Sequence, residues 1–295
     1  MNKLSTGEKI FRVFNYLLLF AICVVTLYPL WHVAMASISD PLIVYAKRGF
    51  YFYPAGEITL RGYKLVLDNP NIISGFLNTL FYVVVGTSIS MFLTILGAYV
   101  LSRKGLYWNN LIMKIIVFTM YFHGGLIPFY LMVKNMGLLD SRWSIILPIA
   151  VNTWNLIIMR TAFAGIPESL VESAKLDGAS DWRIVWVIMV PLAQATVAVI
   201  ALFYAVRMWN EWFNPSIFLS SKDKYPIQLL LREILLQNDT KSMTQLSAVG
   251  QSQQESYRLL VKYCTIMVAT LPILFVYPFL QRYFIQGVMI GSVKG

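Results

Sequence analysis

The stretch Ile166-Pro-Glu-Ser-Leu-Val-Glu-Ser-Ala-Lys-Leu-Asp-Gly-Ala-Ser-Asp-Trp-Arg183 decides how this sequence is interpreted. It holds six of the chain's 38 charged residues, and a long apolar run lies on each side of it. A chain that keeps one short, charged, helix-forming segment between apolar runs presents that segment to the aqueous phase. We therefore expect the segment to contact something outside the apolar part of the protein.

The composition is that of an integral membrane protein. Hydrophobic residues make up 58% of the chain and charged residues 13%, whereas soluble domains carry about 25% charged residues. A helix needs about 20 apolar residues to cross the hydrocarbon core of a bilayer. The charge-free runs of about that length are Val13–Ser39, Asn69–Ser102, Ile115–Val133, Trp143–Met159, Ile184–Val206 and Tyr263–Gln281. The sequence predicts an all-α integral membrane protein with six transmembrane helices.

These runs divide the chain into an N-terminus (1–12), a transmembrane domain (13–282) and a C-terminal tail (283–295). The predicted spans are 14–36, 73–101, 112–133, 144–163, 191–209 and 260–280, with a loop at 164–190. The first run is longer than the apolar region of a cleaved signal peptide, so we expect it to be retained as a helix.

Basic residues set the expected orientation. Lys3, Lys9 and Arg12 precede the first span, and Arg103-Lys104 follows the second. Short basic segments stay on the cytoplasmic side, so both termini and the 164–190 loop are predicted to face the cytoplasm. The net charge of +10 is spread over termini and loops without an arginine-rich cluster, which favours contact with anionic lipid headgroups over nucleic acid.

Local signals divide the charged segment into two helices. Pro167 suits the first helical position, and Glu168 places a negative charge in the first turn. Gly178 is suited to ending this helix, and either Ser180 or Asp181 to capping a second one. The second helix has an apolar stripe that suits packing along a bundle, formed by Trp182, Val185, Trp186 and Met189.

The spacing of this segment resembles a known signature. Glu172-Ser-Ala-x-x-Asp-Gly-Ala179 followed by Ile188-x-Val-Pro191 is similar to the loop of ABC importer permeases, in which Glu-Ala-Ala, three residues, Gly and nine residues precede Ile-x-Leu-Pro. Here Ser replaces one Ala, and Val replaces Leu. Trp209-Asn-Glu-Trp-Phe-Asn-Pro215 and the tail from Arg282 to Gly295 resemble carbohydrate-importer permeases of the maltose-transporter type. Within that type, the chain resembles the subgroup for polysaccharide-derived oligosaccharides.

This resemblance implies the fold of a binding-protein-dependent ABC importer permease in a bacterial cytoplasmic (inner) membrane. The loop 166–191 would include a cytoplasmic coupling helix that docks on an ATP-hydrolysing subunit, and Glu172 would pair with a basic residue there. The implied coupling residues are Glu168, Glu172, Ala174, Asp177, Gly178, Ile188 and Pro191, together with Gly287, Gly291 and Lys294 in the tail. Ala174 and Gly178 would let the partner approach closely.

The same resemblance implies a set of partners. A second homologous permease would complete the translocation pathway, of which this chain forms half. Two ATP-binding cassette subunits would bind on the cytoplasmic side. An extracytoplasmic solute-binding protein would deliver the carbohydrate, and membrane lipid would surround the bundle.

The sequence carries no motif for chemistry of its own. It has no Gly-x-x-x-x-Gly-Lys-Ser/Thr loop, no Gly-x-Ser-x-Gly motif, and only His32 and His123 as histidines. We therefore expect a non-catalytic subunit without a cofactor or metal, whose partner ATPases bind ATP and Mg.

The third span contains Tyr121-Phe-His-Gly-Gly-Leu-Ile-Pro128. Helix-breaking residues at that depth either border a transport pathway or make a packing kink, and both readings stay open. Candidates for the substrate path are Tyr121, His123, Asn152, Trp154, Asn155, Trp209, Asn210 and Glu211. The alternative for each is a structural role, as a hydrogen bond between helices or an anchor at the interface.

Three other functions remain as alternatives. An ABC importer permease for a non-sugar solute would share the fold. An ion-driven secondary transporter would need ionisable residues in mid-membrane and an internal repeat, and only His123 fits. An intramembrane or lipid-modifying enzyme would need a catalytic constellation, which the sequence does not contain.

Overall fold

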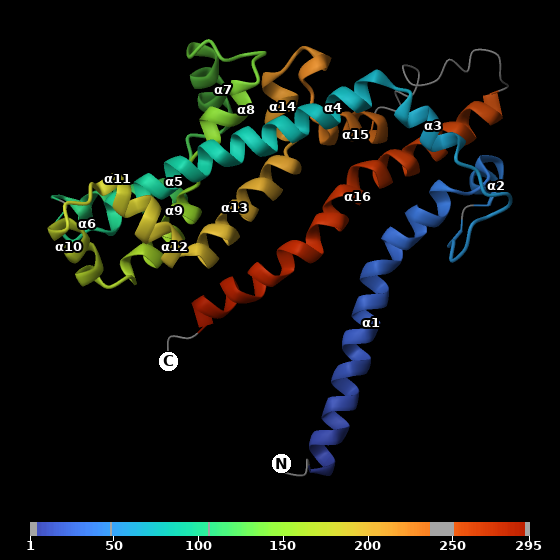
Figure 1. The fold of residues 1–295 in the computed structure, drawn as a ribbon. Coiled ribbons are helices and arrows are strands. Elements are labelled where there is room, and N and C mark those ends of the chain that lie inside the picture. The colour runs from blue at the N-terminus through green and yellow to red at the C-terminus, as the bar shows by residue number, and fades with distance from the viewer. Residues whose placement is uncertain (1–4, 48, 106, 237–250, 293–295) are drawn as a thin grey trace. The chain divides into compact units, whose positions relative to one another are not determined.

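The structure is a computed structural model that describes residues 5–47, 49–105, 107–236 and 251–292. These residues form helices joined by turns and loops, as Figure 1 shows, and they contain no strand. The all-α fold predicted from the sequence is therefore confirmed. The chain divides into two compact units, Met1–Pro70 with Glu233–Pro272, and Asn71–Arg232 with Ile273–Gly295.

The first unit contains α1 (Thr6–Ser37), α2 (Pro41–Ala46), α3 (Arg61–Leu67) and part of α16 (Gln251–Ser292). α1 begins with a capping box. The Ser5 hydroxyl accepts from the Glu8 N–H at 3.3 Å, and the Glu8 carboxylate accepts from the Ser5 N–H at 2.6 Å. Most α1 side chains up to Trp31 are apolar and exposed, which suits a helix surrounded by lipid.

Small and polar residues hold the first unit together. A Cβ on Gly62 would stand 2.6 Å from Sγ of Cys264 and 2.8 Å from Cγ of Leu260, so α3 and α16 touch where only glycine fits. The hydroxyls of Ser37 and Tyr63 lie 2.7 Å apart, and the Cys264 thiol donates to the Ser37 carbonyl at 3.3 Å. These contacts join α1, α3 and α16.

The second unit contains the other helices, except the end of α15 from Glu233, together with the part of α16 after Pro272. They are α4 (Pro70–Phe81), the π-helical turn η1 (Tyr82–Gly86), α5 (Thr87–Ser102), α6 (Asn109–Tyr121), α7 (Leu126–Asn135), α8 (Trp143–Ile146), η2 (Leu147–Ile149), α9 (Thr153–Ala164), α10 (Glu168–Leu176), α11 (Asp181–Arg183), the π-helical η3 (Ile184–Met189), α12 (Val190–Leu192), α13 (Gln194–Trp209), α14 (Phe213–Phe218), η4 (Lys222–Lys224) and α15 (Ile227–Leu236). α4, η1 and α5 make one uninterrupted helix of 33 residues.

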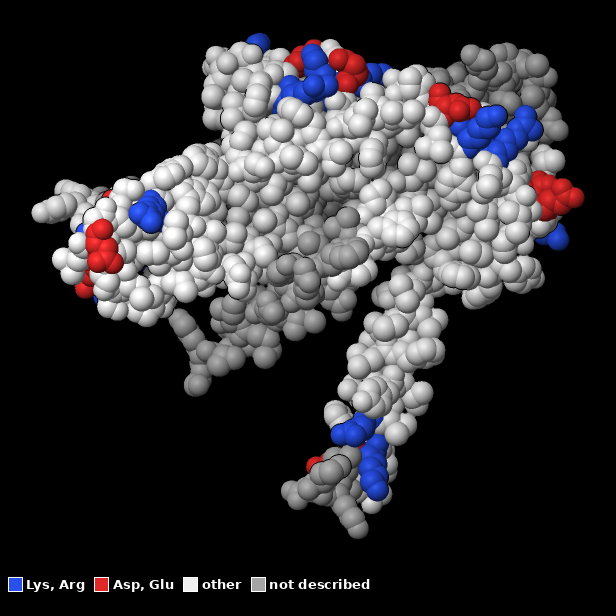
Figure 2. Space-filling model, viewed as in Figure 1, with Lys and Arg blue, Asp and Glu red and all other residues white. Residues whose placement is uncertain are grey.

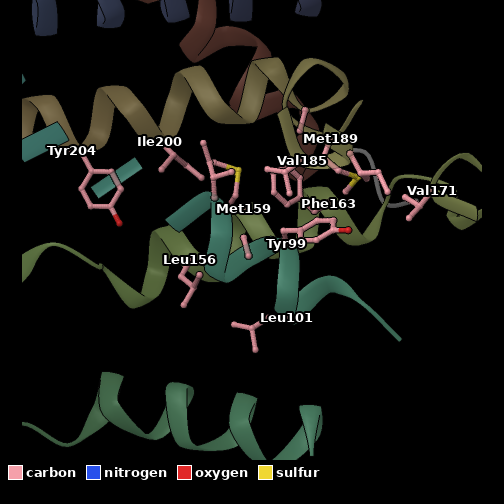
Figure 3. Packing of buried hydrophobic residues seen from close by; sticks show 14 residues of the cluster. Tyr99, Leu101, Leu156, Met159, Phe163, Val171, Val185, Met189, Ile200 and Tyr204 are labelled. Carbon is pink, nitrogen blue, oxygen red and sulfur yellow. The ribbon is translucent and has the colours of Figure 1, made fainter. Parts of the chain in front are cut away.

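The core of the second unit lies between α5, α9 and α13, as Figure 3 shows. Met159 and Phe163 of α9 and Ile200 and Tyr204 of α13 are fully buried there. Lipid tails are as apolar as these side chains, so helices inside a bilayer are held by close van der Waals packing rather than by the hydrophobic effect. The residues at this contact therefore fix how the helices sit against one another.

Three helices in the described part of the chain are long and apolar enough to cross a bilayer, namely Thr6–Ser37, Pro70–Ser102 and Glu255–Phe275. Up to three further spans come from bent pairs. α6 and α7 meet at 115°, the α8–η2 segment and α9 at 51°, and the Asp181–Leu192 segment and α13 at 90°. The count reaches the six that the sequence predicts only if each bent pair is one span.

At the bends, the structure differs from the sequence-based prediction, in which each span is one continuous helix. At predicted span 112–133, α6 ends at Tyr121 and α7 begins at Leu126. Gly125 has φ +88°, a backbone conformation that glycine adopts without steric cost and that cannot continue an α-helix. The Gly pair therefore breaks this segment rather than kinking it slightly.

Charged side chains on the second unit gather at its two ends in the view of Figure 2, and the surface between them is uncharged. One end carries α10 and α11, and the other carries α7 and α14 (Figures 1 and 2). An uncharged band between two charged ends is the distribution expected of a membrane-embedded bundle.

Candidate functional site

The charged segment folds as two helices with a defined turn between them. α10 begins at Glu168, one residue later than the sequence predicts, because Pro167 is its N-cap. At the other end Gly178 has φ +78°, and its N–H donates to the Lys175 carbonyl at 3.0 Å. The Ala179 N–H donates to the Ala174 carbonyl at 2.9 Å. This pair of bonds is a Schellman motif, so the glycine ends the helix.

The second helix starts where the Ser180 hydroxyl accepts from the Arg183 N–H at 3.3 Å, which selects Ser180 over Asp181 as the cap. The helix then becomes π-helical over Ile184–Met189. Of the predicted stripe, Val185 and Met189 are buried and Trp186 packs against the same cluster, whereas Trp182 is 57% exposed. A π-helical turn changes the angle between successive side chains, and Ile184 is fully buried as well.

One face of α10 packs on the core of the second unit. Val171 is 4% exposed and belongs to the same apolar cluster as Phe163 (Figure 3). Ala174 and Ile188 pack against that cluster. Ala174 remains partly exposed, so the close approach of a partner that the resemblance implies at this residue stays a prediction.

The other face of α10 is open to solvent. Glu168, Glu172, Asp177 and Gly178 are exposed, and so is Pro191 beyond η3. Two leucines on α10 are exposed as well, Leu170 at 45% and Leu176 at 89%. Sequence reasoning missed these leucines, although apolar residues in a charged segment are a signal for a docking surface.

Two polar contacts fasten the charged segment to the C-terminal end of α5 and to Lys104, two residues beyond it. Nζ of Lys104 lies 2.9 Å from the Glu168 carboxylate, and both side chains are largely solvated. The hydrogen bond and charge of Lys104 lower the pKa of Glu168, and the same contact raises the pKa of Lys104. The Tyr99 hydroxyl donates to Asp181 at 2.6 Å. The guanidinium of Arg103 stands 4.9 Å from the centre of the Tyr99 ring.

These contacts lie at the two ends of α10. Glu168 is its first residue, and Asp181 follows the turn that ends it. Lys175 reaches Asp181 as well, at 3.5 Å. Movement of α10 is thereby linked to the end of the 33-residue helix Pro70–Ser102. The sequence alone did not identify Tyr99 or Lys104, since nothing local marks a tyrosine inside an apolar run as a partner of a residue 82 positions later.

A cluster of hydrogen-bonded polar residues between three helices contains two of the residues predicted for the substrate path. The Tyr204 hydroxyl lies 2.8 Å from that of Thr94 and accepts from the Asn152 N–H at 3.0 Å. Asn152 caps α9, its side chain accepting from the Asn155 N–H at 3.1 Å. Asn155 is 6% exposed. α5, α9 and α13 are thus joined by hydrogen bonds, and Thr94 and Tyr204 were not among the sequence candidates.

The other path candidates lie elsewhere in the second unit. Tyr121 and His123 are exposed at the α6–α7 break, and Trp154 is 58% exposed on α9. Asn210 donates to the Val206 carbonyl at 3.0 Å, and Glu211 accepts from the Asn214 N–H at 3.1 Å. Both therefore make local contacts at the end of α13. Indole Nε1 of Trp209 is buried without an acceptor in the described residues.

At the other charged end of the second unit, Asp140 holds the loop after α7 in place. Its φ is +53°. Its carboxylate accepts from the Ser221 hydroxyl at 2.5 Å, from the N–H groups of Ser220 and Ser221 at 3.0 Å, and from Nζ of Lys224 at 3.0 Å. These hydrogen bonds, led by the Ser221 hydroxyl, hold the pKa of Asp140 well below its usual range. The loop after α7 is therefore tied to the segment after α14.

The remaining predictions concern the tail and metals. Gly287 and Gly291 fall within α16, and Lys294 lies outside the described residues. Within the residues that the structure describes, no three His, Cys, Asp or Glu side chains come together in a way that could hold a metal ion.

An all-helical chain with bilayer-length apolar helices, and with a charged, capped helix fastened to the end of one of them, has the features of a membrane-embedded transport component. The chain belongs to the family of binding-protein-dependent transport system inner membrane components, whose model matches residues 71–290.

Relatives and a solved structure agree with this assignment. The chain is 39% identical to Protein LplC of Bacillus subtilis over 99% of this chain and 97% of that protein. It is 42% identical to the polygalacturonan/rhamnogalacturonan transport system permease protein YtcP of Bacillus subtilis, over 96% and 97%. It also superposes with a TM-score of 0.86 and 31% identity on a chain of a bacterial ABC transporter involved in import of the acidic polysaccharide alginate, covering 96% and 100%.

Proposed function

We propose that this chain is a membrane-spanning, non-catalytic permease subunit of an ATP-driven, binding-protein-dependent importer of oligosaccharides. The observation that carries the proposal is α10, a charged helix with an exposed outer face and both ends fastened to α5. The nature of the cargo follows from relatives that transport polygalacturonan, rhamnogalacturonan or alginate. The chain would form half of the pathway, and a second permease the other half.

The exposed face of α10 is the proposed docking surface for a cytoplasmic ATPase. Glu172 is exposed and would pair with a basic residue of the ATPase, while Leu170 and Leu176 would enter an apolar cleft. Glu168 has a different role, since it already pairs with Lys104 of its own chain. Gly287, Gly291 and Lys294 would add contacts from the tail.

Orientation and partners complete the proposal. Both termini and α10 would face the cytoplasm of a bacterium, with two ATPase subunits below and a solute-binding protein on the opposite side. Closure of the ATPase pair would move α10, and the two contacts with α5 would carry that movement into the bundle. A rigid-body change of this kind couples two distant sites.

The cargo is tested with the complete transporter in proteoliposomes, by measuring ATP hydrolysis with binding protein and a panel of oligosaccharides. We expect acidic or rhamnose-containing fragments to stimulate hydrolysis, because the relatives carry such polymers. If no sugar-loaded binding protein stimulates hydrolysis while another solute does, the carbohydrate assignment is wrong.

The docking surface is tested with Glu172→Lys, which places like charges against each other. We expect the variant to lose the ATPase on purification, or to hydrolyse ATP without transport. Glu57→Lys is the matched control, because Glu57 is also exposed but lies in the loop before α3. Full transport by Glu172→Lys would refute docking through this face.

A further inference from the structure

The two faces of α6 differ in what they contact. One face packs on the core of the second unit, and its side chains there are Ile112, Met113 and Ile116. The side chains of the opposite face follow one another at helical spacing, and they are Lys114, Phe118, Tyr121 and Phe122. All four are exposed. We call them the outer face of α6, and this face is open to something other than the core of its own unit.

Two phenylalanines form a joined aromatic surface on the outer face. The rings of Phe118 and Phe122 lie 4.3 Å apart between centroids and only 15° from parallel. Phe118 is 55% exposed and Phe122 67%, and Tyr121 beside them is 76% exposed. The C–H side of a sugar ring is apolar and packs on aromatic rings, whereas its hydroxyls need hydrogen-bond partners nearby. The aromatic surface therefore fits the apolar side of a sugar ring.

The break that ends α6 lies between the two charged ends of the second unit. α6 begins at Asn109, five residues after Lys104, which pairs with Glu168 at the end that carries α10. α7 lies at the other charged end (Figures 1 and 2). α6 has 13 residues, which at about 1.5 Å per residue is about 20 Å. The hydrocarbon core of a bilayer is roughly 30 Å thick, so α6 ends before it has crossed the core.

Backbone groups at the break exclude a covering of lipid tails. His123, Gly124 and Gly125 are exposed, and their N–H groups donate to no acceptor among the residues that the structure describes. Irregular backbone at membrane depth is tolerated only where it is buried in protein or lines a water-filled cavity. The end of α6 therefore faces either a packed protein surface or water.

Lys114 favours water over a packed protein surface. It is exposed on the same face as the aromatic pair, and no acidic side chain of the described residues forms a salt bridge with it. Ionisable residues within membrane spans mark substrate and ion pathways, and lysine is depleted from the buried centre of protein interfaces. A positive charge beside an aromatic surface and free N–H donors is complementary to a sugar that carries a carboxylate.

We propose that the outer face of α6 lines the translocation path and binds oligosaccharides that carry carboxylate groups. Lys114 contacts the carboxylate, Phe118 and Phe122 contact the sugar ring, and the N–H groups of the break donate to its oxygens. The relatives named for polygalacturonan and for the acidic polysaccharide alginate agree with this charge class. The inference rests on the proposed function, and it adds the side chains and the charge by which the cargo is recognised.

The aqueous surroundings of this face are tested with single cysteines in the complete transporter in proteoliposomes, in a background without Cys23 and Cys264. Phe118→Cys and Phe122→Cys should react with a charged methanethiosulfonate that is present on both sides of the membrane. Val25→Cys is the matched control, because Val25 is 71% exposed on α1, whose side chains suit contact with lipid. Reaction at both phenylalanine positions no faster than at Val25 would overturn the inference.

The contacts themselves are tested by uptake of a galacturonate oligomer with ATP and binding protein. Lys114→Gln should lower uptake per ATP hydrolysed about threefold or more, and Lys114→Arg should restore it because the charge returns. Phe118→Ala with Phe122→Ala should lower it about tenfold. Lys9→Gln and Phe20→Ala are the controls, since both residues are exposed on α1.

The outcomes separate this inference from the proposed function. Wild-type uptake per ATP in Lys114→Gln and in the double phenylalanine variant would overturn the inference and leave the proposed function intact. A loss in Lys114→Gln that Lys114→Arg does not restore would show that the charge is not the contact. If the wild type imports another solute but no carbohydrate, the proposed function fails, and the inference fails with it.

Discussion

Single residues define the surface that α10 presents. Gly178 ends the helix at φ +78°. The hydrogen bonds from the N–H groups of Gly178 and Ala179 to the preceding carbonyls of α10 depend on that conformation. Glu168 is held by Lys104, whereas Glu172 one turn later is exposed. Two carboxylates on one short helix thus have different surroundings, since one is paired within its own chain and the other has no such salt bridge and is exposed.

Gly178→Ala tests the turn. A side chain at positive φ costs about 1–2 kcal/mol, because Cβ approaches the following carbonyl. No atom lies within 4 Å of the position that Cβ would occupy, so the cost comes from the backbone alone. We expect a lower melting temperature and weaker ATPase binding in pull-down of the complex. Gly105→Ala is the control, since Gly105 is equally unobstructed but lacks positive φ. Equal effects of the two substitutions would contradict this account.

The Glu168–Lys104 contact predicts a pH dependence. The pKa of Glu168 is lowered in the folded protein, so its contribution is complete above the unfolded value of about 4.3 and is lost as pH falls through the lower folded value. Lys104, whose pKa is raised, keeps its contribution until pH rises through a value above about 10.4. The ratio of transport to ATP hydrolysis should therefore not change through this contact between about pH 5 and pH 9. Glu168→Gln should lower that ratio equally across the range, and a Glu168-dependent change centred near neutral pH would show that the contact is wrong.

At the scale of elements, α5 links the charged segment to the cluster of hydrogen-bonded polar residues around Tyr204. Its C-terminal end carries Tyr99 and the following basic residues, and Thr94 lies little more than one turn earlier. The π-helical turns η1 and η3 lie in the two elements that flank this core, and π-helical turns are frequent at functional sites. Force applied to α10 would reach α9 and α13 through α5 and through the apolar cluster that Val171 joins.

Tyr99→Phe and Asp181→Asn test that connection. Each removes or weakens a hydrogen bond of 2.6 Å, worth about 1 kcal/mol because Asp181 is largely solvated. We expect ATP hydrolysis to continue while transport per ATP falls. In a double-mutant cycle the two effects should be less than additive. Tyr107→Phe is the control, since Tyr107 is 87% exposed. Fully additive effects would mean that the residues act separately.

At the scale of the whole molecule, orientation is the property that function requires. The proposed function places α10 on the side of the ATPases and the loop before α3 on the other side of the membrane. Single cysteines in a background without Cys23 and Cys264 test this in intact bacteria. Tyr107→Cys, at an 87% exposed position after the basic pair Arg103-Lys104, should react with a membrane-impermeant maleimide only after the membrane is opened. Tyr53→Cys, at a 76% exposed position, should react before that. The reverse pattern would invert the topology.

Much of this protein could be predicted from its sequence, because the relevant information is local or periodic. Apolar run length determines membrane helices, and the Gly178 and Ser180 positions determine where the charged segment turns. The spacing from Glu172 to Pro191 is sufficient by itself to indicate the family. Each of these properties depends on residues that lie within one short stretch, so it can be read along the chain.

The tertiary structure alone decided which residues meet. Tyr99 with Asp181, Thr94 with Tyr204 and His32 with Tyr263 are separated by many positions, and helix packing brings them together. The face that Ala174 presents also depends on packing. The physical reason is that side-chain contacts between helices depend on the rotation and bend of each helix, and a single π-helical turn or a positive φ changes both.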